Sequence, residues 1–311
     1  MLKVTYQYVV IVGILSFLGT IGLTIIFRIL GQNHLIGNLY ANVRGGIPRG
    51  IGLVPCILLS IFLTKNYNLV LTIGFFASLD DILGRYKPRF LPIELGQLFR
   101  GIGMVAVMIM GYETLGFSAI LIALMIQPIN ISDMQPGSTC SVVIIMSLLS
   151  LLFMILMGFP NNIGEIHIYQ ALVVLVCCMA YSPLDYAGRI MMGEVGNHSF
   201  AIALGLIFYS VGGLVSTLFL FIITTILIAF IRKNTLKKFF KEQLKINNPV
   251  FGDFIMDVLT GGGLGDLLRK IFLGKKQIQV KNPILMILGF RRLLYNPNAR
   301  LHYNQINHHW I

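Results

Sequence analysis

Apolar runs occupy most of the first 231 residues of this 311-residue chain and restrict what it can fold into. They lie at residues 8–30, 51–64, 69–79, 101–112, 115–129, 140–159, 166–182, 199–211 and 213–231. A composition of 56% hydrophobic and 12% charged residues does not describe a soluble globular domain. We therefore predict an all-α, polytopic membrane protein with about nine transmembrane helices.

Charge placement predicts the orientation of these segments. The pair Gly212-Gly213 interrupts the last long run, so two short helices joined by a tight turn are expected there. With the N-terminus outside, 22 of the 24 Lys and Arg residues fall on the cytoplasmic side, and only Lys3 and Lys65 face outside. Fourteen of the 22 lie after residue 231. We therefore predict a transmembrane catalytic domain over 1–231 and a basic cytoplasmic or interfacial tail over 232–311.

The formal charge of +12 does not indicate a nucleic-acid partner, because the cations are scattered between apolar segments rather than gathered on one stripe. In the tail, "KNTLKKFFKEQLK" (233–245) predicts a helix lying on anionic membrane lipid, and the glycine-rich 260–266 predicts a flexible turn. The four cysteines all lie in or beside apolar runs and are expected to be packing residues: Cys56, Cys140, Cys177 and Cys178.

Acidic residues sit at the ends of the apolar runs, on the side inferred to be cytoplasmic: Asp80, Asp81, Asp133, Asp185 and Glu194. The run 69–79 would rise only about 17 Å as a helix, against a hydrocarbon thickness of about 30 Å, so Asp80 and Asp81 should be recessed. An ion pair from Arg85 to Asp81 is one explanation. Carboxylates on separate loops also suit Mg²⁺, which favours phosphoryl chemistry, with a proton or ion pathway as the main alternative.

Four motifs in order resemble the polyprenyl-phosphate phosphosugar transferases, the family of the bacterial phospho-N-acetylmuramoyl-pentapeptide transferase. They are "NVRGGIPRGIGL" (42–53), "SLDDILGRYKP" (78–88), "NISDMQPG" (130–137) and "PLDYAGRIMMGEVGNHSFAIALG" (183–205). The resemblance implies that polyprenyl phosphate attacks the β-phosphate of a UDP-sugar, with release of UMP. It also implies Mg²⁺ as cofactor, with Mn²⁺ as a substitute, and leaves a homodimer open as the assembly.

The resemblance assigns roles to individual residues. Asp80 would engage or deprotonate the lipid phosphate, Asp81 would arrange the phosphates and metal, and Glu194 would occupy a metal-ligand position. Asn130 and Asp133 match the loop that shapes the nucleotide and metal site. Phosphate contacts or interfacial snorkelling are equally expected of two arginines, Arg44 and Arg49.

The chain departs from the family pattern at several positions. The family has Asp at the position of Glu194, a second acid at that of Pro136, and an aromatic that can stack on uracil at that of Met191. Its C-terminal histidine motif is matched only loosely by His302, His308 and His309. The departures favour a distant branch of the family, and an archaeal branch is one candidate. The substrate would be a UDP-linked amino-sugar that carries a peptide, or a simple UDP-N-acetylhexosamine. An inactive relative and a lipid or ion transporter or flippase are the alternatives.

Overall fold

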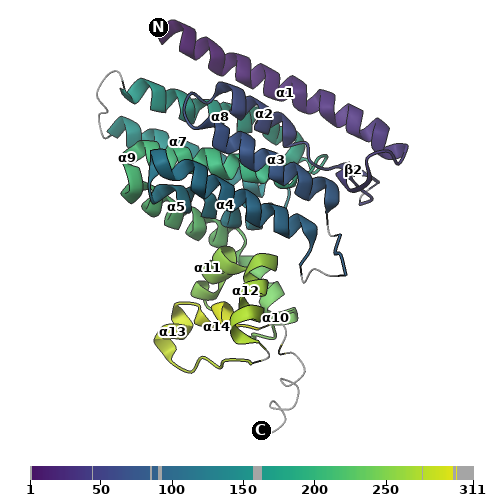
Figure 1. The fold of residues 1–311 in the computed structure, drawn as a ribbon, viewed down its shortest axis with the longest axis vertical. Helices are drawn as coiled ribbons and strands as arrows, with labels where there is room; N and C mark the ends of the chain where they lie inside the picture. The colour runs from purple at the N-terminus through teal and green to yellow at the C-terminus, as the bar shows by residue number, and fades with distance from the viewer. Residues whose placement is uncertain are drawn as a thin grey trace. The chain divides into compact units, whose positions relative to one another are not determined.

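The computed structural model describes residues 2–43, 45–84, 86–89, 93–156, 163–274, 276–296 and 299. Arg44, Arg85, His302, His308 and His309 lie outside these residues. The chain divides into two compact units, Met1–Thr224 and Thr225–Ile311, and the predicted boundary at 231/232 falls within the second. Apart from one short hairpin, the regular structure of the described residues is helical (Figure 1).

The first unit is a bundle of helices with one small hairpin. Its helices are α1 (Leu2–Gln32), α2 (Leu53–Phe62), α3 (Tyr67–Leu83), α4 (Leu95–Leu115), α5 (Ser118–Leu124), α6 (Ile126–Ser132), α7 (Ser138–Leu156), α8 (Ile163–Tyr186) and α9 (Gly193–Ile231), the last ending in the second unit. A 3-10 turn, Gly37–Leu39, precedes the antiparallel pair β1 (Tyr40–Ala41) and β2 (Ile47–Pro48). Helix α1 packs against α8, and α3 packs against α4.

Five helices of the described chain are long and apolar enough to cross a membrane: Tyr6–Gln32, Leu95–Leu115, Ser138–Leu156, Glu165–Tyr186 and Gly193–Ile231. The chain is thus a multi-pass membrane protein, but the predicted count of nine spans is wrong. The run 51–64 forms a helix of 10 residues, and the run 115–129 forms two helices of seven residues each. The run 69–79 belongs to a helix of 17 residues. At 1.5 Å per residue, even the longest rises about 25 Å, short of about 30 Å of hydrocarbon.

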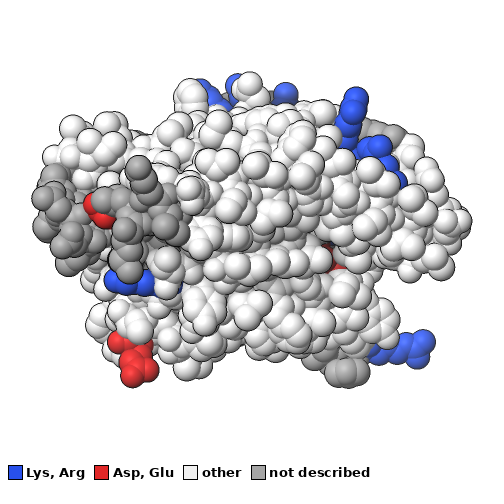
Figure 2. All heavy atoms as spheres, turned by 90° about the horizontal axis from the view of Figure 1, so that it is seen from above, with Lys and Arg blue, Asp and Glu red and all other residues white. Residues whose placement is uncertain are grey.

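Apolar side chains cover much of the outer surface of the first unit. On α1, Val10, Leu18 and Ile29 are each more than half exposed, whereas Val12 and Ser16 on the opposite face are buried. The face seen in Figure 2 carries its charged side chains near the edges and is uncharged across most of the area between them. Such a surface suits lipid rather than water.

The predicted break at Gly212-Gly213 is confirmed. Gly213 has a φ of +68°, and neither glycine is helical. The Ser216 hydroxyl donates to the Phe208 carbonyl oxygen at 2.7 Å. Residues eight apart in a continuous helix are separated by about 12 Å along its axis, so this bond requires a sharp bend.

The interior of the first unit is packed by large side chains and closely approaching glycines. Tyr181, Phe200 and Phe208 are fully buried, and all four cysteines are buried free thiols, which confirms their predicted packing role. Gly52 faces the backbone of Gly196, and a Cβ at either position would overlap the other segment. This close approach brings the start of α2 against the first turns of α9.

The second unit is built from α10 (Lys233–Glu242), α11 (Phe251–Thr260), α12 (Gly263–Leu273), α13 (Pro283–Ile287) and α14 (Phe290–Leu293), after the end of α9. The segment 233–245, predicted to lie on anionic lipid, forms α10, and one of its two phenylalanines faces the interior of this unit. Phe240 is fully buried and its ring packs on Phe254 of α11, with centroids 5.5 Å apart. Of the glycine-rich segment 260–266, only Gly261 and Gly262 form the turn between α11 and α12, and residues 263–266 belong to the first turn of α12.

Candidate active site

A backbone pairing between distant segments forms one wall of the candidate site. The N–H of Met191 donates to the Pro48 carbonyl at 2.8 Å, and the N–H of Gly52 donates to the Met192 carbonyl at 3.0 Å. Residues 48–52 therefore run beside 191–192, just before α9 begins. This pairing brings Arg49 next to Glu194, although the two are far apart in sequence.

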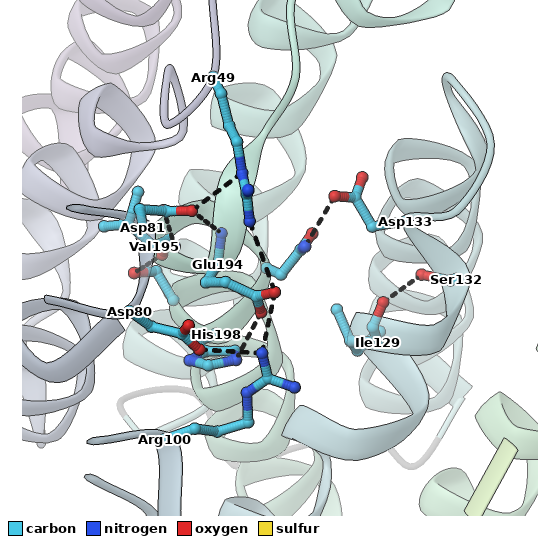
Figure 3. Close-up of polar contacts among 12 residues, drawn as sticks. Arg49, Asp80, Asp81, Arg100, Ile129, Ser132, Asp133, Glu194, Val195 and His198 are labelled. Atoms are coloured by element: carbon cyan, nitrogen blue, oxygen red, sulfur yellow. Dashed lines mark hydrogen bonds and ion pairs between the residues drawn. The ribbon is translucent and has the colours of Figure 1, made fainter. Parts of the chain in front are cut away.

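Asp81, in the last turn of α3, anchors the start of α9 (Figure 3). Its two carboxylate oxygens accept the backbone N–H groups of Glu194 and Val195, each at 3.0 Å, and Oδ1 lies 3.3 Å from Arg49 Nε. A carboxylate at the first turn satisfies otherwise unpaired N–H groups and complements the helix dipole. Asp81 is only 1% exposed, so its carboxyl group is directed to these contacts and away from solvent.

Two glycines flank Glu194 because the chain is crowded on both sides of it. Gly193 has a φ of +74°, and a Cβ there would meet Gly50 and the Asp81 carboxylate. Gly196 packs against Gly52, as described above. The sequence Gly-Glu-Val-Gly thus lets α9 begin in direct contact with α3 and with the segment before α2.

Glu194 lies at the centre of a polar network. Its Oε1 is 2.9 Å from Arg100 Nη2 and 3.9 Å from Arg49 Nη2, and its Oε2 is 3.2 Å from His198 Nε2. With the Asn130 amide turned so that its nitrogen faces Glu194, that nitrogen donates to Oε2 at 3.0 Å. A carboxylate surrounded by two guanidinium groups is held in one position by charge.

Asp80, the neighbour of Asp81, points to Arg100 of α4 instead of α9. Arg100 Nη2 lies 2.9 Å from Asp80 Oδ2, so this guanidinium bridges Asp80 and Glu194. Gly96 leaves the room for this contact, because a Cβ there would overlap the Asp80 carboxyl group. Arg49, Asp80, Asp81, Arg100 and Glu194 form what we call the carboxylate–arginine cluster. With every group ionised, its three carboxylates and two guanidinium groups have a formal net charge of minus one.

A cleft of about 670 Å³ opens beside this cluster. Its lining includes five of the predicted site residues, together with Pro136 from the loop after α6: Arg49, Asn130, Asp133, Met191 and Glu194. Asp80, Asp81 and Arg100 lie behind it rather than in its wall. Asp185 also lines the cleft and accepts the Gly137 N–H at 3.0 Å, which ties the loop after α6 to the end of α8.

Asp133 enters the cleft from the end of α6. Asn197 Nδ2 donates to Asp133 Oδ2 at 2.8 Å. Burial raises the pKa of Asp133 well above its usual value, and the Asn197 hydrogen bond opposes that rise. A half-buried carboxylate with an amide rather than a cation as its contact favours the approach of a positive charge.

The predicted metal ligands have different surroundings. Asp133 and Glu194 line the cleft, whereas Asp81 is held by Arg49 and the start of α9. Among the described residues, no three His, Cys, Asp or Glu side chains converge to hold a metal ion. Mg²⁺ commonly uses one or two carboxylates and completes its shell with water and phosphate oxygens. Asp133 and Glu194 are the two predicted ligands that line the cleft.

Two members of the network were not predicted from the sequence. Arg100 directly precedes the apolar run 101–112, where it resembles an ordinary interfacial cation. His198 lies one helical turn after Glu194, a spacing that places both on one face and could have indicated the pair.

Comparison of the sequence with protein-family profiles and with curated proteins finds no match in either case.

Proposed function

We propose that this protein is a membrane transferase that moves a phospho-sugar from a UDP-sugar to polyprenyl phosphate and releases UMP, as a step in making a cell-envelope precursor. The observation that carries the proposal is the meeting of Asp80, Asp81 and Glu194 with two arginines beside the cleft. The three acidic residues and Arg49 come from the motifs that resemble the phosphosugar transferases, whereas Arg100 lies outside them. In this proposal the cleft opens to the cytosol at the cell membrane.

The reaction needs two anionic phosphates to approach each other. An oxygen of the lipid phosphate forms a bond to the β-phosphorus of the UDP-sugar, the bond between the α- and β-phosphates breaks, and UMP leaves with the electron pair. There is little covalent work for the protein, so positioning and charge neutralisation supply most of the catalysis.

Arg49 is placed to contact substrate phosphate because its side chain is one-third exposed and lines the cleft. Arg100 is less exposed and holds Asp80 and Glu194 together from behind. Asp81 positions Arg49 and the first turn of α9. Asn130 and Met191 offer an amide and an apolar surface to the nucleotide, within a cleft large enough for one.

Mg²⁺ belongs to the proposal as a cofactor held by Asp133 and Glu194. Bound there, it would neutralise phosphate charge. The cleft wall carries three carboxylates, Asp133, Asp185 and Glu194, and among its described residues Arg49 is the only arginine or lysine. An anionic nucleotide is repelled by such a wall unless a cation accompanies it.

The test is UMP release by the purified protein with polyprenyl phosphate, Mg²⁺ and a panel of UDP-sugars. Arg49→Gln should lower the rate about 10²-fold if its charge stabilises the reacting phosphates. Arg89→Gln, which removes an exposed arginine outside the four motifs, is the matched control. A transporter or flippase, the rival function, would move lipid or ions in proteoliposomes without forming UMP or a lipid-linked sugar.

A further inference from the structure

A second polar cleft, of about 520 Å³, lies at the other ends of the helices that carry the candidate active site. Its wall includes Lys65, Thr114, His167, Gln170, Tyr209 and Ser210, which come from the segment before α3 and from α4, α8 and α9. Its volume is within the range of small-molecule sites.

Helix geometry separates this cleft from the carboxylate–arginine cluster. Arg100 and Thr114 are 14 residues apart on α4, which corresponds to about 21 Å along the helix. Glu194 and Tyr209 are 15 residues apart on α9, before its break, which corresponds to about 22 Å. A ligand in the second cleft therefore does not reach the cluster.

The charged side chains that line the two clefts differ: carboxylates predominate in the first, and a lysine is found in the second. Among the described lining residues of the second cleft the only fully charged side chain is Lys65, and none is Asp or Glu. His167 and Tyr209 lie in the same wall. Gln170 is only 5% exposed, and its amide is oriented by a 3.2 Å hydrogen bond to the Thr64 hydroxyl. A buried amide such as that of Gln170 is costly unless it is hydrogen-bonded, so this bond fixes the orientation of the side chain in the wall of the cleft.

We propose that this second cleft binds an oxyanion, the phosphate or carboxylate of a small ligand or of a lipid headgroup, on the side of the helices opposite the candidate active site. Lys65 supplies the positive charge, as lysine does in many phosphate sites, and the Tyr209 hydroxyl in the same wall supplies a neutral donor. The Thr114 and Ser210 hydroxyls already donate to the carbonyl oxygens of Gly111 and Leu206. The proposal is independent of the transferase reaction.

Thiol labelling can test the site directly. The four native cysteines are buried, so Thr114→Cys introduces an exposed thiol in the wall of the cleft. Its rate of reaction with a maleimide is measured in neutral detergent, in potassium phosphate and in potassium chloride of equal ionic strength. At ten times the dissociation constant, phosphate should slow labelling about 10-fold, because only about one site in eleven is free. Ser210→Cys provides a second reporter.

Two further variants test whether the protection by phosphate depends on Lys65 and on the second cleft. Lys65→Gln combined with Thr114→Cys should label at the same rate in both salts, whereas Arg49→Gln, in the first cleft, should leave the protection intact. In nanodiscs of neutral lipid, protection that appears when phosphatidylglycerol is added identifies a headgroup as the source of the anion. Equal labelling rates in phosphate, chloride and both lipids, or protection that survives Lys65→Gln, would overturn the proposal.

Discussion

Asp81→Asn is expected to destabilise the first unit by loosening the start of α9. The buried carboxylate accepts two backbone N–H groups at 3.0 Å and lies 3.3 Å from Arg49. Asparagine keeps one acceptor oxygen and no charge, so one backbone bond and the ion pair are lost. Hydrogen bonds to charged groups are worth about 1.5–3 kcal/mol, and the partly exposed Arg49 can recover some solvation. We expect a loss of about 2–4 kcal/mol.

The loss should appear as a lower melting temperature. For a unit of this size, each 1 kcal/mol corresponds to about 2–4 °C, so Asp81→Asn should melt roughly 5–15 °C earlier in detergent. Asp266→Asn is the matched control, because its ion pair with Arg269 is 42% exposed on the carboxylate side and should matter little. UMP release is measured below both melting temperatures. An unchanged melting temperature with complete loss of UMP release would show that Asp81 acts on the substrate instead of on α9.

Three other outcomes are expected. Glu194→Gln should reduce UMP release about 10²-fold or more, because it removes a charge at the cleft wall, whereas Glu194→Asp keeps that charge and should retain part of the rate; wild-type rates in Glu194→Gln at limiting Mg²⁺ would return this glutamate to a structural role. Excess EDTA should abolish UMP release, and full turnover in it would remove the metal from the reaction. Gly52→Ala should lower stability by about 1–3 kcal/mol in thermal melts because its Cβ meets the Gly196 backbone, while Gly22→Ala, with no atom near its Cβ, is the control; equal melting temperatures would contradict the close contact.

The cluster also explains how acidic residues are tolerated at helix ends near lipid. Asp80 lies at the C-terminal end of α3, where the helix dipole repels it, and Arg100 offsets that cost. Asp81 lies at the same end, but it faces the N-terminal end of α9, where the dipole attracts it. Two adjacent carboxylates thus have different partners on different helices. Asp81 therefore positions the start of α9, whereas Asp80 is linked through Arg100 to Glu194.

The amino-acid sequence alone indicated a multi-pass helical membrane protein. It also indicated the helix ends at which the candidate site residues lie. Hydrophobic runs are local, so they predict membrane helices without knowledge of packing, and the break at Gly212-Gly213 follows from two residues with little helical preference. The acidic residues at the ends of separate runs indicated that Asp80, Asp81, Asp133 and Glu194 would lie in one region.

Only the tertiary structure decided which of these residues face each other. The number of long helices depends on where each helix stops, and α2 and α5 stop short of membrane thickness. The pairing of Asp81 with α9 joins residues more than 110 positions apart, and the burial of Phe240 depends on a ring of α11. Such contacts form when helices pack and bring together side chains that are far apart in sequence. A local sequence pattern does not show which of these side chains will meet.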